Sequence, residues 1–217
     1  MAGAVIDSIG LISGGLTIAS FFMDNLPGGG SSPVGAHVQI KSGLGDDSIS
    51  NLKGFTDSVY AYDYNNNYLG QSGYGCGEGA DGGSCELTVD QGSFGTVQAD
   101  YVSVANGDDA TCISWISVTQ SDGSPGGAWT GDIGDHCGVR TYYGNQQAGT
   151  YPDGSTWRPL CAWFDSDGTD GIKYAALKFT VRAYGELSSD TITKNQGCSA
   201  TLFAPDNGPI NGKILLR

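Results

Sequence analysis

The sequence predicts an all-β protein, a β-sandwich of about nine or ten mainly antiparallel strands preceded by an apolar, helix-like N-terminal extension. Three observations favour this class. Glycine supplies 36 of the 217 residues, more than twice its usual share of about 7 %. Short stretches of alternating apolar and polar residues recur between turn-forming residues. The six cysteines, an even number, are typical of a disulfide framework.

The extension comes first. Residues 2–26 carry only two charges, Asp7 and Asp24, and lack the basic start of a signal peptide. Their apolar side chains recur at helical spacing and on other faces too, which predicts a buried helix, although glycines weaken it. Such a segment is removed, enters a membrane, packs on its own domain or docks on another molecule. In the last case the self-association residues are Val5, Ile6, Ile9, Leu11, Ile12, Leu16, Ile18, Phe21 and Phe22.

The sandwich domain follows a short linker. Residues 1–27 form the extension, residues 28–33 a Gly/Ser/Pro linker, and residues 34–217 the disulfide-bonded domain. Period-two patterns predict strands at 34–41, 58–65, 96–105, 110–119, 137–145, 160–165, 173–185, 198–204 and 213–217. The alternation is cleanest at 173–185. There we expect Ala175, Leu177, Phe179, Val181 and Ala183 to point inward, and Tyr174, Lys178, Arg182 and Tyr184 to point outward.

The cysteines indicate an oxidising compartment. Cys76, Cys85, Cys112, Cys137, Cys161 and Cys198 include no C-x-x-C pair, and the chain has only two histidines, so three disulfides are favoured over a zinc site. Cys76 and Cys85 flank a short Gly-rich loop and are expected to pair. Six cysteines allow 15 pairings, and beyond that local pair we favour Cys137–Cys161.

Charge excludes one class of partner. The chain has 23 acidic and 10 basic residues, a net charge of −13. A surface of this sign repels phosphate backbones, so nucleic acid is not expected as a partner.

Two acidic motifs are candidates for chemistry. Asp165, Asp167 and Asp170 lie in a Gly-containing turn and carry the oxygen ligands that calcium prefers. Their spacing departs from a calcium loop, and an ordinary turn is the favoured interpretation. No other cofactor is expected. Asp132, Asp135 and His136 lie close together in sequence, but one histidine among turn residues favours a structural loop over an acid–base site. We therefore predict that the protein has no catalytic residues and is not an enzyme. A hydrolase remains an alternative, because pairs of carboxylates can hydrolyse glycosidic bonds.

Aromatic side chains suggest a second kind of site. Tyr60, Tyr62 and Tyr64 share one face of an expected strand, and Trp157 lies among further tyrosines. Exposed aromatic rings on a sheet stack on sugars. Such rings are more often cross-strand pairs or core, and carbohydrate binding is one hypothesis for these four residues.

The region from Cys112 to Gly171 also carries a resemblance. It contains CISWISVTQSDGSPGGAWTGDIGDHCG, then YYGN, then LCAWFDSDG. The motifs W-T-G-D-x-G-x-x-C-G, Y-Y-x-N and C-x-W-F-D resemble a family of secreted, cysteine-containing fungal proteins of uncharacterised function. Met23-Asp-Asn-Leu-Pro27 resembles the end of that family's apolar N-terminal stretch, whereas Ile133 stands where the family has a second Trp. The resemblance implies secretion and implies no activity.

Together these features favour a non-enzymatic, secreted fungal surface or matrix protein. It would self-associate through its apolar N-terminal segment, as a homo-oligomer or filament, by docking that segment on a neighbouring copy. The alternatives are a lectin-like module that binds cell-wall glycans and a membrane-active effector or toxin. The last is the least favoured, since Asp7 and four glycines make a poor membrane helix.

Overall fold

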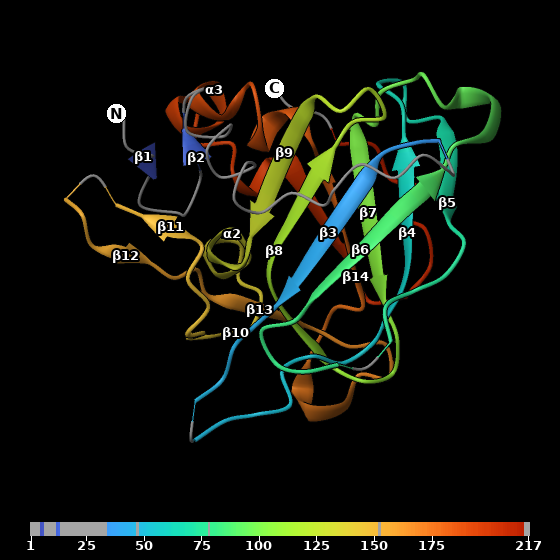
Figure 1. Cartoon of the computed structure of the whole chain (residues 1–217). Helices are drawn as coiled ribbons and strands as arrows, with labels where there is room; N and C mark the ends of the chain where they lie inside the picture. Colours follow the sequence, from blue (N-terminus) through green and yellow to red (C-terminus); the bar gives the residue numbers. More distant parts are fainter. Residues whose placement is uncertain are drawn as a thin grey trace.

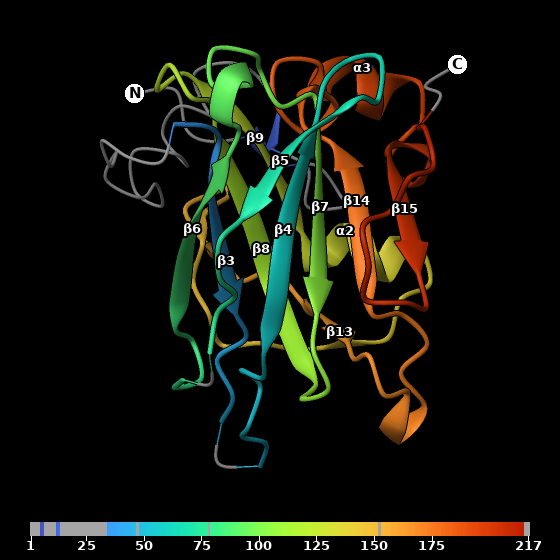
Figure 2. The ribbon, with the colours of Figure 1, turned by 90° about the vertical axis from the view of Figure 1, so that its right-hand side faces the viewer.

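The computed structural model describes residues 34–46, 48–77, 79–151 and 153–214, together with the backbone of residues 5–6 and 12–13. Two layers of antiparallel strands pack face to face (Figures 1 and 2). The first layer contains β9 (Pro125–Thr130), β8 (Thr111–Thr119), β3 (His37–Ser42) and β6 (Ser84–Asp90), with β13 (Cys161–Phe164) and β10 (Thr141–Tyr142) beside the start of β8. The second contains β5 (Tyr68–Ser72), β4 (Thr56–Tyr62), β7 (Tyr101–Asn106), β14 (Ala176–Thr180) and β15 (Thr201–Ala204).

The two layers form one continuous sheet of 11 strands. They join at one corner, where Gln71 and Ser72 of β5 pair with Asp90 and Val89 of β6. The all-β class is thus confirmed, and each strand expected between residues 34 and 204 overlaps an observed one. The predicted strands leave out β5, β6 and β9 of this sheet; β9 begins with Pro-Gly-Gly and β5 contains a glycine, whereas β6 does alternate and was overlooked. At 213–214 the chain forms no strand.

The remaining elements are short. A separate hairpin pairs β11 (Gly149–Thr150) with β12 (Thr156–Trp157). Among the described residues, the α-helices are α2 (Gly131–His136) and α3 (Ser188–Thr193), each of six residues. The 3-10 turns are η1 (Gly92–Phe94), η2 (Thr169–Gly171), η3 (Arg182–Tyr184) and η4 (Cys198–Ala200). Within the described ranges, no helix is long and apolar enough to cross a membrane.

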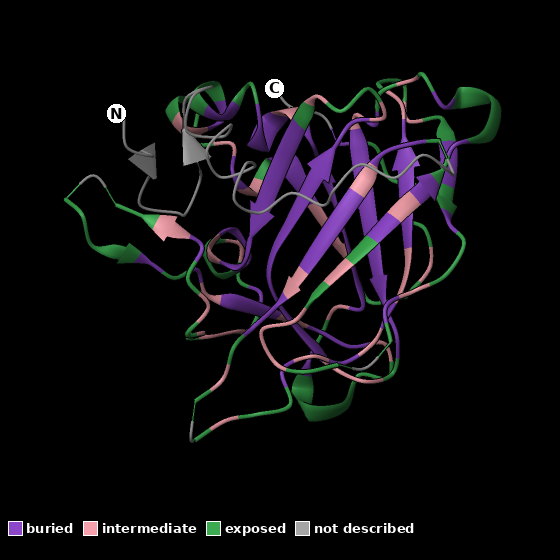
Figure 3. Cartoon of the chain, in the orientation of Figure 1, coloured by how far each residue is buried: buried purple, intermediate pink, exposed green. Residues whose placement is uncertain are grey.

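The principal core lies between the two layers. Inward side chains of both layers alternate with outward ones, so that Val38 and Val118 meet Val59, Val102 and Phe179 across the sandwich. Figure 3 shows the buried residues concentrated on these central strands and the exposed ones on the loops. Burial of this apolar surface is the main favourable contribution to folding.

Two glycines allow the first layer to meet the end of β14. Gly127 of β9 bridges to Gly185, just after η3. A Cβ on Gly127 would lie 2.1 Å from the carbonyl oxygen of Val181, and one on Gly185 would lie 1.9 Å from that of Gly126. Only glycine permits this close backbone approach.

The outward set expected at 173–185 is partly wrong. Strand β14 ends at Thr180, and Lys178 and Tyr184 are buried. Tyr184 follows the strand in η3, where its hydroxyl contacts Thr201 at 2.6 Å inside the core. Lys178 does face away from the principal core, but other residues of the chain cover it. Arg182 is half exposed, as expected.

The N-terminal segment is described only at four residues. Strands β1 (Val5–Ile6) and β2 (Ile12–Ser13) pair antiparallel, and β2 lies against α3. At these four residues paired strands therefore replace the helix-like form expected there, in keeping with the β-branched residues Val5, Ile6 and Ile12. The other expected self-association residues lie outside the described ranges: Ile9, Leu11, Leu16, Ile18, Phe21 and Phe22.

All six cysteines form disulfides. Cys76 pairs with Cys85, as predicted. The expected Cys137–Cys161 pair is wrong: Cys161 pairs with Cys112 across neighbouring strands β13 and β8, and Cys137 pairs with Cys198 of η4. The pairing follows from the strands, because β13 lies next to β8 and Cys161 and Cys112 form a cluster of their own, whereas Cys137 packs against the principal core. Three disulfides indicate an oxidising compartment.

Candidate functional site

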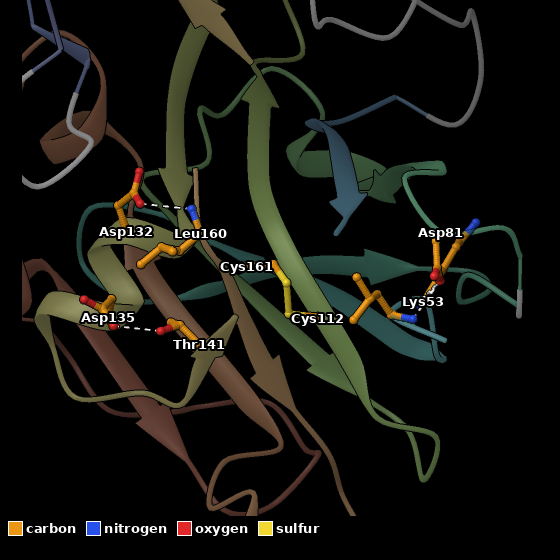
Figure 4. The surroundings of a disulfide bond; sticks show 9 residues. Lys53, Asp81, Cys112, Asp132, Asp135, Thr141, Leu160 and Cys161 are labelled. Carbon is orange, nitrogen blue, oxygen red and sulfur yellow. Dashed lines mark hydrogen bonds between the residues drawn. A yellow bond between two sulfur atoms is a disulfide. The ribbon is translucent and has the colours of Figure 1, made fainter. Parts of the chain in front are cut away.

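The Asp132–Asp135–His136 motif serves the architecture. It forms α2, and Figure 4 shows Asp132 accepting a hydrogen bond from the Leu160 backbone (3.0 Å) and Asp135 accepting one from the Thr141 hydroxyl (2.7 Å). Asp132 also accepts from the Trp157 indole at 3.2 Å. His136 is exposed. The two carboxylates thus tie α2 to the chain that follows it, which fits the structural interpretation of this motif.

The Asp165–Gly171 loop is held by its own hydrogen bonds. Buried Asp165 accepts from the Thr169 hydroxyl at 3.1 Å, and exposed Asp167 accepts from the Thr169 backbone at 2.8 Å. Burial raises the pKa of Asp165, whereas the bonds from Thr169 lower the pKa of Asp167. In the part of the chain that the structure describes, no three His, Cys, Asp or Glu side chains converge as metal ligands. Calcium at Asp165, Asp167 and Asp170 stays a sequence-based prediction.

The expected tyrosine platform is mostly covered. Tyr60, Tyr62 and Trp157 are 8 %, 1 % and 1 % exposed, so they offer no ring face to a ligand in solvent. Only Tyr64, at 66 %, is exposed. The period-two pattern placed Tyr60 and Tyr62 on the correct face, but it did not show that the C-terminal residues pack over that face. Tyr60, Tyr62 and Trp157 therefore do not form the exposed ring platform that the sequence predicted.

A different aromatic residue is presented to solvent at the edge of the first layer. Trp163 of β13 lies between Ala162 and Phe164, which are both fully buried in the core, so its indole points to the opposite face. It is half-buried there and packs beside the Cys112–Cys161 disulfide. Its backbone N–H donates to the carbonyl of Arg140 at 2.9 Å, which fixes Trp163 next to Arg140.

Two adjacent cavities share Trp163 and Arg140 as walls, and we call them the Trp163 groove. The first, of about 310 Å³, is also lined by Asp135, Val139, Lys173 and Tyr174. The second, of about 240 Å³, is also lined by Ile49, Thr141, Tyr142 and Asp170. Each is close to the lower limit of about 300 Å³ for small-molecule sites.

Two hydrogen bonds hold the walls of the groove in place. The Arg140 guanidinium donates to the backbone carbonyl of Asp170, so Arg140 is fixed between the two cavities. The Asp135–Thr141 bond joins one wall of the first cavity to one wall of the second. The loop expected to bind calcium supplies Asp170 to one cavity and Gly171 to the other. Side chains that are already held in place lose less conformational entropy when a ligand binds.

The chemistry of the groove suits a polar ligand that has ring faces. Trp163 and Tyr142 offer apolar ring surface, while cationic and acidic side chains offer hydrogen-bond donors and acceptors. The opposite charges, Arg140 and Lys173 against Asp135 and Asp170, leave the groove without net charge in a chain of charge −13. This combination favours an uncharged polar ligand over an ion.

Sequence reasoning missed this groove. Trp163 and Arg140 lie on strands that the sequence predicts. The carbohydrate hypothesis nevertheless named the tyrosines in and after β4, because they repeat at every second position. The signal that points to Trp163 is a large aromatic residue at the outward position of a short strand whose neighbours, Ala162 and Phe164, point inward. Comparisons of the chain with protein-family models, with curated proteins and with solved structures find no significant match.

Proposed function

We propose that the protein is a secreted, non-catalytic binding protein and that the Trp163 groove binds a neutral glycan. The single observation that carries this proposal is the pair of cavities of about 310 and 240 Å³ on either side of Trp163 and Arg140. Consecutive sugar residues present an apolar ring face and hydroxyl groups at every step. The groove offers an aromatic face and fixed polar groups in each half.

Two neighbouring tyrosines provide a matched test. Tyr142 lines the second cavity, whereas Tyr143 is 84 % exposed and lies outside both cavities. The test measures binding to soluble β-glucan, mannan and chitin oligosaccharides by calorimetry and to the insoluble polymers by pull-down. We expect Trp163→Ala to abolish binding, Tyr142→Ala to weaken it about tenfold and Tyr143→Ala to leave it unchanged. A loss of about 1–3 kcal/mol of binding free energy for each ring removed would match the usual strength of stacking on aromatic side chains.

Two results would refute the proposal. One is wild-type protein that binds none of these glycans. The other is glycan binding that survives Trp163→Ala, because the site would then lie elsewhere. Circular dichroism of each variant controls for the fold.

Self-association through the N-terminal segment is the second candidate function. Its support is the apolar character of residues 2–26, which carry two charges. Since β2 lies against α3 of the same chain, we propose that any exchange between copies uses this hairpin and the residues that follow it. Fungal origin and a place at the cell surface belong to the same proposal.

A further inference from the structure

The C-terminal residues 205–214, which we call the C-terminal strap, cover the outer face of the second layer. Figure 2 shows this red segment beside β14 and β15. Ile214 is 4 % exposed and packs with Tyr60, Tyr62 and Tyr101, and Ile210 lies against the same cluster. The strap therefore occupies a face that would otherwise be open to solvent.

The covered face is rich in tyrosine. Tyr62 of β4 lies directly opposite Tyr101 of β7, and its ring centroid is 6.0 Å from that of Tyr68. Tyr62 and Tyr101 are 1 % and 5 % exposed, whereas Tyr68 and Tyr64, at the margin, are 50 % and 66 % exposed. The strap thus divides one tyrosine face into a covered centre and an open margin.

Lys178 of β14 binds the strap through hydrogen bonds to its backbone. Its fully buried ammonium donates to the carbonyls of Ile210 (2.9 Å) and Gly212 (3.2 Å) and to the Asn66 side-chain oxygen (2.6 Å). These bonds use all three N–H groups. The Asn66 amide also donates to the Asn211 carbonyl at 3.0 Å. Three successive strap carbonyls are therefore bound by two side chains, Lys178 of β14 and Asn66 of the turn between β4 and β5.

The Tyr62 ring completes the site, with its centroid 3.5 Å from the Lys178 nitrogen. Tyr101 lies 5.4 Å away. The ring faces attract the ammonium. No carboxylate forms an ion pair with the Lys178 ammonium. The two ion pairs among the described residues are Arg182–Glu186 and Lys194–Asp190.

Other features make the closed strap costly. A buried ammonium without a counter-charge is penalised by desolvation, and burial lowers the pKa of Lys178 to about 8. The Tyr62 hydroxyl is buried without a hydrogen-bond partner among the described residues. The strap adds no backbone–backbone hydrogen bond of its own within residues 205–214. Its attachment rests mainly on the Lys178 and Asn66 bonds and on two isoleucines, and Lys213 adds a contact with the Tyr64 ring, whose centroid lies 5.8 Å from the lysine nitrogen.

We propose that the C-terminal strap is a releasable cover and that Lys178, supported by Asn66, is the latch that keeps it on the tyrosine face. Release would expose Tyr60, Tyr62 and Tyr101 together with the tyrosines at the margin. The sandwich beneath would stay folded, because the principal core lies on the other side of β4, β7 and β14.

Hydrogen exchange and tyrosine acetylation in the full-length protein test this proposal. Lys178→Met removes the latch, and Asn66→Ala removes one of its acceptors and the bond to Asn211. Lys173→Met, at an exposed lysine shortly before β14, is the matched control. We expect the acetylation rate of Tyr60, Tyr62 and Tyr101 to rise at least tenfold in Lys178→Met and less in Asn66→Ala, with the control at the wild-type level.

Exchange in β8 separates release from unfolding, since this strand lies in the other layer. The proposal requires exchange protection in β8 to be retained in Lys178→Met while acetylation of the three covered tyrosines rises. Unchanged acetylation in both variants would overturn the proposal. So would a rise in acetylation accompanied by loss of protection in β8, because Lys178 would then stabilise the whole fold rather than the strap.

Discussion

The indole N–H of Trp157 donates a hydrogen bond to the carboxylate of Asp132, 3.2 Å away. The other oxygen of Asp132 accepts from the backbone of Leu160 at 3.0 Å. One carboxylate on α2 thus fixes both the β11–β12 hairpin and the chain that enters β13. Because β13 carries Trp163, Asp132 supports the groove without lining it.

We expect Asp132→Ala to destabilise the fold by about 2–4 kcal/mol, because two bonds to a charged acceptor are lost and a buried indole N–H loses this partner. Asp135→Ala, on the same helix, removes one exposed bond to Thr141 and should cost about 1 kcal/mol or less. Urea denaturation of both variants measures the difference. Equal losses would show that Asp132 has no special role.

The disulfides should rank by the length of chain that each one closes. Replacing Cys137 and Cys198 by Ala opens a separation of 61 residues, and replacing Cys76 and Cys85 opens one of 9. Chain-entropy arguments give losses of about 4 and about 2.5 kcal/mol respectively. Thermal unfolding of the two double variants checks the order, and a reversed order would contradict the entropic explanation.

Gly127→Ala should be among the most damaging small substitutions. The added methyl group would lie 2.1 Å from a backbone oxygen of Val181, which cannot move without displacing the end of β14. We expect a loss of about 3 kcal/mol or more, at the upper end of the usual cost of overpacking. Gly73→Ala meets nothing within 4 Å and should change the free energy of unfolding by less than about 0.5 kcal/mol.

Lys178 should make stability rise with pH above 8. Its pKa is about 8 in the folded protein and 10.5 as a free side chain, so between these values the unfolded state binds more protons. The burial penalty is fully present below pH 8 and is relieved as pH rises toward 10.5. At about 1.36 kcal/mol per pKa unit, the gain between pH 8 and 9.5 is about 1–2 kcal/mol.

Urea titrations at the two pH values compare the wild type with Lys178→Met, which should lack this gain. The measurement stops at pH 9.5 because the raised pKa of Tyr62, about 12, has the opposite effect once tyrosines ionise in the unfolded chain near pH 10. Parallel pH profiles for both proteins would rule out the assignment.

Deletion of residues 2–26 tests self-association directly. We expect the full chain to elute as a dimer or larger species at high concentration and the deletion variant to elute as a monomer, because the nine expected self-association residues are removed. Light scattering coupled to size exclusion gives the masses. A monomeric full-length chain at high concentration would exclude this function.

Local pattern located eight strands of the large sheet, but it missed β5, β6 and β9 and could not show what covers the strands. The alternation at 173–185 correctly places Leu177 and Phe179 in the core, because the side-chain period of a strand is two. It fails at Lys178, since a pattern assumes that the second face meets water, and docking of a distant C-terminal segment is a tertiary event. The same limit hid the burial of Tyr62 and left Trp163 unrecognised. Cysteine pairing likewise followed from which strands are neighbours, which spacing does not encode.

The larger disulfides overlap along the chain, because Cys137 lies between Cys112 and Cys161, and Cys161 lies between Cys137 and Cys198. A single peptide-bond cleavage anywhere from Cys112 to Cys198 therefore leaves its two fragments covalently joined. Surface loops in this span, including those around Gly123 and Gly168, can be nicked without releasing a piece of the molecule. The groove residues Arg140, Trp163 and Lys173 all lie within this span, so a nicked chain keeps them in one covalent piece.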